Sequence, residues 1–88
     1  MPVISRFFGI VVTMYQETGR HERPHFHARY AEFKASIAID PPVVMAGALP
    51  RRQERLVLAW AELHRDELME NWRRLGDDES VLWIAALQ

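Results

Sequence analysis

The side chains best suited to chemistry lie in residues 20–30, which hold three of the four histidines and three arginines. His25 and His27 alternate with Phe26 in a segment that we predict to be a β-strand. Alternate residues of a strand share one face and lie about 7 Å apart along the backbone, so two imidazoles can converge on one metal ion. His21, on the loop before them, is a candidate third ligand. Three histidines and a water molecule form an open zinc site of the catalytic type.

Metal binding is one of two interpretations of these histidines. The sequence has no cysteine, which excludes thiolate ligands, and no carboxylate lies at a telling spacing from the histidines. Pairs of histidines on a strand also arise by chance. We therefore predict no cofactor, with the histidines hydrogen-bonded on an open sheet face, and keep a divalent metal such as zinc at His21, His25 and His27 as the alternative.

Basic side chains close to the histidines predict an anion site. We assign it to Arg23, Arg29 and Lys34, because guanidinium forks match the oxygens of phosphate and carboxylate groups. A ribonuclease without a metal could use a histidine as general base and an arginine to stabilise the developing charge. On that hypothesis the candidate catalytic residues are His25, His27 and Arg29, and RNA is a possible partner.

A β-hairpin is predicted to position these side chains. Residues 25–30 and 33–39 alternate with period two, and a two-residue turn at Ala31 and Glu32 fits poorly with the usual preference for Asn or Gly. That register places three pairs on the core face: Tyr30 with Phe33, Ala28 with Ala35, and Phe26 with Ile37. It places three others on the open face: His25 with Ala38, His27 with Ser36, and Arg29 with Lys34.

The flanking segments predict the rest of a sheet. Residues 4–15 are rich in β-branched and aromatic side chains on both faces, which predicts one central strand with a bulge at Gly9. A polar loop follows over residues 16–24. Residues 43–45 are predicted as a short edge strand before a turn at Gly47, and residues 81–84 as a last short strand.

Residues 51–75 have helical spacing with two apolar stripes. One stripe holds Leu56, Trp60 and Leu63, and the other holds Leu68, Trp72 and Leu75. The second is rotated from the first by roughly 80–100°, so we predict a break near residues 64–66, with Asp66 capping a second helix. One long curved helix is the alternative. Gly76 is the predicted terminator.

These elements predict the fold class and the organisation of the chain. The expected fold is α+β: an antiparallel meander of three or four strands, with the C-terminal helical region packed on one face. A chain of 88 residues is expected to form one domain over residues 1–88. No apolar run approaches the roughly 20 residues of a membrane helix, and the N-terminus lacks a signal-peptide pattern, so we expect a cytoplasmic protein.

Charge is unevenly distributed along the sequence. Residues 1–55 carry eight basic and five acidic side chains, a net of +3, whereas residues 56–88 carry three basic and seven acidic ones, a net of −4. The total of −1 argues against a dedicated nucleic-acid-binding protein. The asymmetry predicts that one end attracts anions, or that copies of the chain associate.

Several segments together resemble a bacterial family of short proteins known as domain of unknown function 4160. They are residues 1–10, 24–28, 34–37, 49–51 and 60–72. Such proteins are suspected components of toxin–antitoxin-like pairs, and the resemblance carries over no catalytic residue. The first functional prediction is therefore an interaction or regulatory module that works with a partner protein. The alternative is a small hydrolase, RNA-directed or metal-dependent, centred on His25 and His27.

Overall fold

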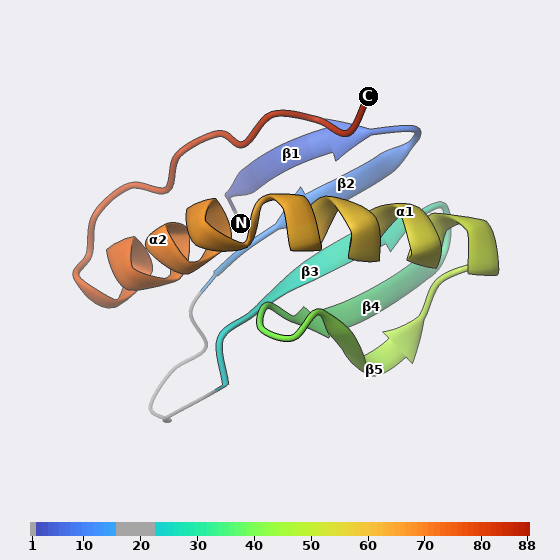
Figure 1. Cartoon of the computed structure of the whole chain (residues 1–88), viewed down its shortest axis with the longest axis horizontal. Helices are drawn as coiled ribbons and strands as arrows, with labels where there is room; N and C mark the ends of the chain where they lie inside the picture. Colours follow the sequence, from blue (N-terminus) through green and yellow to red (C-terminus); the bar gives the residue numbers. More distant parts are fainter. Residues whose placement is uncertain (1, 16–22) are drawn as a thin grey trace.

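The computed structural model describes residues 2–15 and 23–88 and shows an antiparallel five-stranded sheet with two helices (Figure 1). The strands pair in chain order: β1 (Val3–Phe7), β2 (Ile10–Thr13), β3 (His25–Tyr30), β4 (Phe33–Ala38) and β5 (Val43–Ala48). The helices are α1 (Arg51–Leu63) and α2 (Arg65–Gly76). The α+β class and the meander are confirmed, but the predicted count of three or four strands is too low.

The first predicted strand is two strands joined by a tight turn. Phe8 and Gly9 have φ angles of 51° and 78°, and two positive φ angles in a two-residue loop are typical of a type I′ hairpin turn. A Cβ atom on Gly9 would also lie 3.2 Å from a ring carbon of Tyr30. The bulge predicted at Gly9 is therefore wrong, because the run of apolar residues hid a chain reversal.

Strand β5 is longer than the sequence predicted. Gly47 lies within it, opposite Ala35, with a φ of 74°, and a Cβ atom there would overlap the carbonyl oxygen of Lys34. The pairing with β4 also shifts between Ser36 and Ile37, which leaves Met45 as the extra residue of a bulge. The glycine thus lets β5 approach β4 closely and does not turn the chain.

The β3–β4 hairpin has the predicted register at every position. Phe26 pairs with Ile37 on the core face, and His27 pairs with Ser36 on the other face. The turn holds two residues, and Ala31 accepts a φ of 52°. Period-two alternation therefore determined the pairing even though the turn residues were unfavourable.

The core lies between one face of the sheet and the helices. Trp60 of α1 is fully buried there, with ring centroids 5.3 Å from Phe7 and 5.8 Å from Phe26. Leu68 of α2 is also fully buried in this core. Neither α1 nor α2 lies on the opposite face of the sheet, called the open face below (Figure 1).

The predicted break between the helices is confirmed at His64, whose φ and ψ of −112° and 26° are not helical. The predicted cap is wrong: His64 holds the capping position of α2 without a side-chain cap bond, and Asp66 lies in the first turn. The Asp66 carboxylate instead accepts a hydrogen bond from Arg65 at 3.0 Å. Gly76 is not the terminator that the sequence predicted: it still belongs to α2, and the left-handed residue beyond the helix is Asp78, with a φ of 59°.

Residues 79–88, called the C-terminal segment below, contain no helix or strand. The strand predicted at residues 81–84 is therefore wrong, although Ile84 donates its N–H to the carbonyl of Ile4 at 2.8 Å. The Trp60 indole N–H donates to the carbonyl of Ala85, also at 2.8 Å. Figure 1 shows this segment returning past α2 to β1. Side chains of the helices, rather than a strand ladder, hold its backbone.

Candidate binding site on the open face of the sheet

The open face of the sheet contains a depression of about 570 Å³ to which all five strands contribute. The strand registers arrange the side chains of this face in two rows that cross the sheet. The first row reads Arg6, Val11, Arg29, Lys34 and Ala48 from β1 to β5, and the second reads Val3, Thr13, His27, Ser36 and Ala46. The first row is cationic and the second is polar, so the depression suits a ligand with negative charge.

Arg29 and Lys34 are direct neighbours in the cationic row, and Arg6 lies two strands from Arg29. Neighbouring strands are about 4.8 Å apart, so the three side chains span roughly 15 Å of the surface. All three are exposed, and none of them forms an ion pair with any residue in the described part of the chain. Their charges are therefore available to an anionic partner.

His27 lies in the polar row within the depression. Its ring stacks on that of Tyr15, with centroids 4.5 Å apart and planes inclined by 10°. Its Nδ1 atom lies 3.3 Å from the hydroxyl oxygen of Ser36. The stacking and the hydroxyl fix the plane of the imidazole beside the cationic row, where it could exchange protons with a bound group.

His25 is not among the residues that line the depression and is only 4% exposed. Its ring centroid is 5.1 Å from that of His27 and 5.2 Å from the Trp72 ring of α2. Its Nδ1–H donates to the carbonyl of Arg23 at 2.8 Å, because a carbonyl can only accept. The prediction that His25 belongs to an exposed set with His27 and Arg29 is therefore wrong, since α2 packs against it.

The metal site remains a prediction. His21 lies outside the described residues, so the proposed three-histidine set cannot be assembled from them. Within residues 2–15 and 23–88, no three His, Cys, Asp or Glu side chains are grouped as a metal site would require. The rings of His25 and His27 are close enough to approach one metal ion, but Nδ1 of His25 already donates to the Arg23 carbonyl.

The predicted anion site is divided by the structure. Arg29 and Lys34 line the depression together, whereas Arg23, just before β3, is not among the residues that line it. Arg6 lines it and was missed. The signal for Arg6 was present in the sequence, because a turn at Gly9 would have paired β1 with β2 and brought Arg6 into register with Val11 and Arg29.

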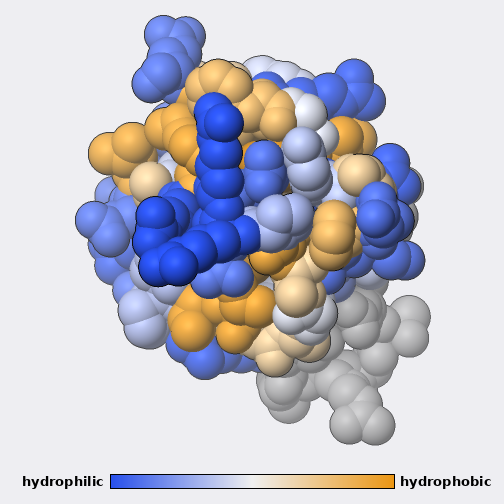
Figure 2. Space-filling model, turned by 90° about the vertical axis from the view of Figure 1, so that its right-hand side faces the viewer, coloured by the Kyte–Doolittle hydropathy of each residue, from blue (hydrophilic) through white to orange (hydrophobic). Residues whose placement is uncertain are grey.

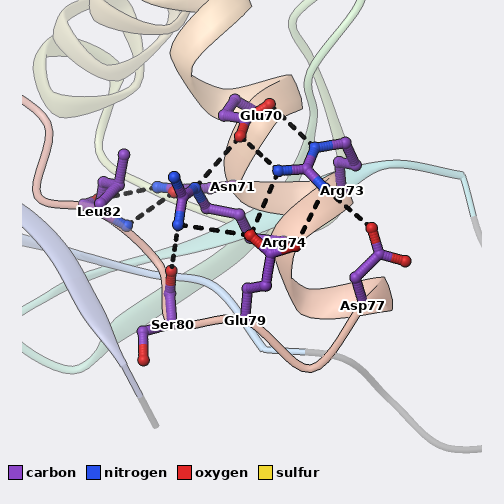
Figure 3. A network of polar contacts seen from close by, with 8 residues as sticks. All are labelled: Glu70, Asn71, Arg73, Arg74, Asp77, Glu79, Ser80 and Leu82. Atoms are coloured by element: carbon purple, nitrogen blue, oxygen red, sulfur yellow. Dashed lines mark hydrogen bonds and ion pairs between the residues drawn. The ribbon is translucent and has the colours of Figure 1, made fainter.

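A network of ion pairs lies around α2 (Figure 3). Arg73 bonds Glu70 at 2.7 Å, Asp77 at 2.8 Å and Glu79 at 3.2 Å. The hydrogen bond from Arg73 lowers the pKa of Glu70 below its usual value. Arg74 bonds Glu70 and also donates to the carbonyl of Ser80, so the network ties the C-terminal segment to α2.

Asn71 fastens the same segment from within (Figure 3). Its side chain is 1% exposed, donates to the carbonyl of Leu82 and accepts from the Leu82 N–H, both at 2.8 Å. The Asn71 amide thus satisfies both backbone groups of Leu82, as a residue on a neighbouring strand would. The segment does not need a ladder of its own, which explains why its run of apolar residues formed no strand.

Comparison with protein families adds one result. The family model described as Domain of unknown function (DUF4160) matches residues 9–73, more than half of the chain. The chain belongs to this family. In the DUF4160 chain the matched region includes β2 to β5, all of α1 and most of α2. No curated protein and no solved structure matches the chain.

The DUF4160 match contains Arg29, Lys34 and His27 of the depression and ends at Arg73. Among the residues that the structure describes, no helix of this DUF4160 chain is long and apolar enough to cross a membrane.

Proposed function

We propose that this protein is an interaction or regulatory module of the bacterial cytoplasm, working with a partner protein as one half of a toxin–antitoxin-like pair. In this proposal an acidic surface of the partner docks on the open face of the sheet. The observation that carries it is the cationic row of Arg6, Arg29 and Lys34, whose charges meet no carboxylate in the described residues.

Two physical arguments support an acidic partner. Arg29 and Lys34 lie directly opposite each other, which is unfavourable for like charges, and a partner carboxylate would relieve that repulsion. A field of one sign also steers an oppositely charged protein and raises its association rate. The unequal charge of the two halves of the chain is thus used for recognition at one face.

The experiment starts with a partner identified by affinity purification from the native host and then produced in pure form. We expect the double variant Arg29→Glu/Lys34→Glu to bind it at least about tenfold more weakly, because like charges across an interface are strongly unfavourable. Affinity is measured by isothermal titration at two salt concentrations, and the wild-type affinity falls as salt rises.

The matched control is Arg52→Glu/Arg55→Glu. These arginines are exposed on α1, on the helical side of the molecule, and also lack ion pairs in the described residues. The charge change is identical, so only the location differs. Equal losses in both double variants would mean that total charge, and not the open face, governs binding, and the proposal would fail.

A second candidate function is a small hydrolase that acts on RNA, and the position of His27 favours it. His27 lies in the depression beside Arg29 and Lys34, as a general base beside charge-stabilising groups would. Of the histidine pair only His27 lines this depression, so His27→Ala should abolish cleavage of a labelled RNA while His64→Ala retains it. Cleavage that survives His27→Ala, or wild-type protein without cleavage, would exclude this candidate.

A further inference from the structure

The two edges of the sheet differ in what covers them. At β1 the C-terminal segment lies alongside, and Ile84 bonds the carbonyl of Ile4. At the other edge, β5 pairs with β4 and with no other described element. Five of its six residues are exposed, including Val43 at 42% and Met45 at 46%. An uncovered apolar edge is a template for pairing with another strand.

The edge strand also presents only small side chains on the open face. On the open face β5 contributes Ala46, opposite Ser36, and Ala48, opposite Lys34. A strand added beside β5 would lie two strand spacings from β4, roughly 10 Å, with only an alanine methyl group between them. A glutamate on that strand and Lys34 can meet over Ala48. The alanines therefore open the cationic row toward the edge.

The composition of β5 indicates which occupant fits. Its sequence, Val-Val-Met-Ala-Gly-Ala, carries no charge, so a second copy paired through β5 would offer no carboxylate to Lys34. A strand with acidic side chains at alternate positions would satisfy both the edge and the cationic row. Charge complementarity thus favours a different protein over a second copy.

We propose that the partner binds by strand addition: a segment of the partner with alternating acidic residues pairs with β5 and directs its carboxylates over Ala46 and Ala48 toward Lys34 and Arg29. This inference rests on the proposed function and names its mode of binding. Main-chain hydrogen bonds supply affinity, and the acidic side chains supply specificity. The bulge at Met45 interrupts the edge, so the added strand is short.

The first test uses a defined probe, a fluorescein-labelled peptide Thr-Glu-Val-Glu-Val-Glu-Thr, and measures fluorescence anisotropy. We expect saturable binding that weakens at least about tenfold when glutamine replaces each glutamate. Methylation of alternate backbone nitrogens should weaken it similarly, because those nitrogens can no longer donate to β5. Binding that tolerates methylation would overturn strand addition.

The second test changes the edge. Ala48→Glu places a carboxylate beside Lys34 and should weaken peptide binding at least about tenfold. The matched control, Val43→Glu, adds the same charge to β5 outside the two rows and should have a much smaller effect. Equal effects of the two substitutions would contradict the predicted path of the acidic side chains.

Hydrogen exchange separates this inference from the proposed function. Binding of the natural partner should protect amides of residues 43–48 and leave those of β1 unchanged. If the partner binds and Arg29→Glu/Lys34→Glu abolishes binding, yet β5 gains no protection, the proposed function stands and strand addition is wrong. Sedimentation of the free protein as a dimer with protected β5 amides would assign the edge to a second copy and also overturn the inference.

Discussion

Two regions of this molecule, α2 and the open face of the sheet, handle positive charge in opposite ways. Around α2, Arg65, Arg73 and Arg74 each form ion pairs, and the Arg73 and Arg74 network holds the turn and the C-terminal segment in place. On the open face, Arg29 and Lys34 stand side by side with no carboxylate partner in the described residues. Cations that maintain the fold are paired within it. Cations left without pairs on a concave face indicate a site for something outside the chain.

The largest effect is expected from removing the buried hydrogen bonds between Asn71 of α2 and the backbone of Leu82. Asn71→Leu removes both hydrogen bonds to Leu82 and leaves the Leu82 backbone groups without a partner. We expect the free energy of unfolding to fall by about 2–4 kcal/mol, measured by urea denaturation, because two partly buried hydrogen bonds are lost.

Leu63→Ala provides the control for Asn71→Leu. Leu63 is 72% exposed at the end of α1, and its loss should change stability by about 0.5 kcal/mol or less. A change for Asn71→Leu no larger than that of the control would mean that the C-terminal segment contributes little to stability.

Low pH should lower the stability of the fold around α2 by protonating Glu70. The Arg73 hydrogen bond lowers its pKa below the ordinary value of 4.5, so the ionised carboxylate favours the folded state. This contribution is present above the unfolded pKa and is lost as pH falls below 4.5 through the folded pKa. Glu70→Gln should flatten the decline of stability below that pH. An unchanged pH profile in thermal melts would show that the network contributes nothing to stability.

The smallest expected change in stability comes from comparing the loss of one cation on the open face with the loss of one cation beside α2. Lys34→Gln removes a cation that faces Arg29, so stability should stay constant or rise by about 0.5 kcal/mol at most. Arg73→Gln removes a paired cation and should lower stability, more at low salt than at high salt. Both variants are compared by urea denaturation in the same buffers. A loss of stability in Lys34→Gln that matches that of Arg73→Gln would contradict the proposed division between the two regions.

Local periodicity predicted most of what positions the site. The alternation in residues 25–39 determined the β3–β4 register, and the rotation of the apolar stripes located the break at His64. Chain reversals were harder to predict. The turn at Phe8 and Gly9 lies inside a continuous apolar run, where no polar residue marks the end of a strand.

The missed parts of the site depend on contacts between distant segments. Arg6 joins the cationic row only after β1 folds back on β2, and His25 is buried because Trp72 of α2 packs against it. The residue pattern of one segment does not reveal which distant segment will pack against it. The C-terminal segment was misread for the same reason, since its backbone bonds the side chains of Trp60 and Asn71 and meets β1 through the Ile84–Ile4 bond, without forming a strand ladder.

The contact between the first strand and the C-terminal segment determines how far the chain can be truncated. Ile4 and Ile84 are 0% and 1% exposed and bond each other through the backbone, yet both lie outside the DUF4160 match at residues 9–73. A fragment trimmed to those limits would lack β1 and leave the Trp60 indole N–H without its acceptor. We expect it to aggregate or remain unfolded by circular dichroism. The folding unit of this family member is therefore wider than its sequence signature.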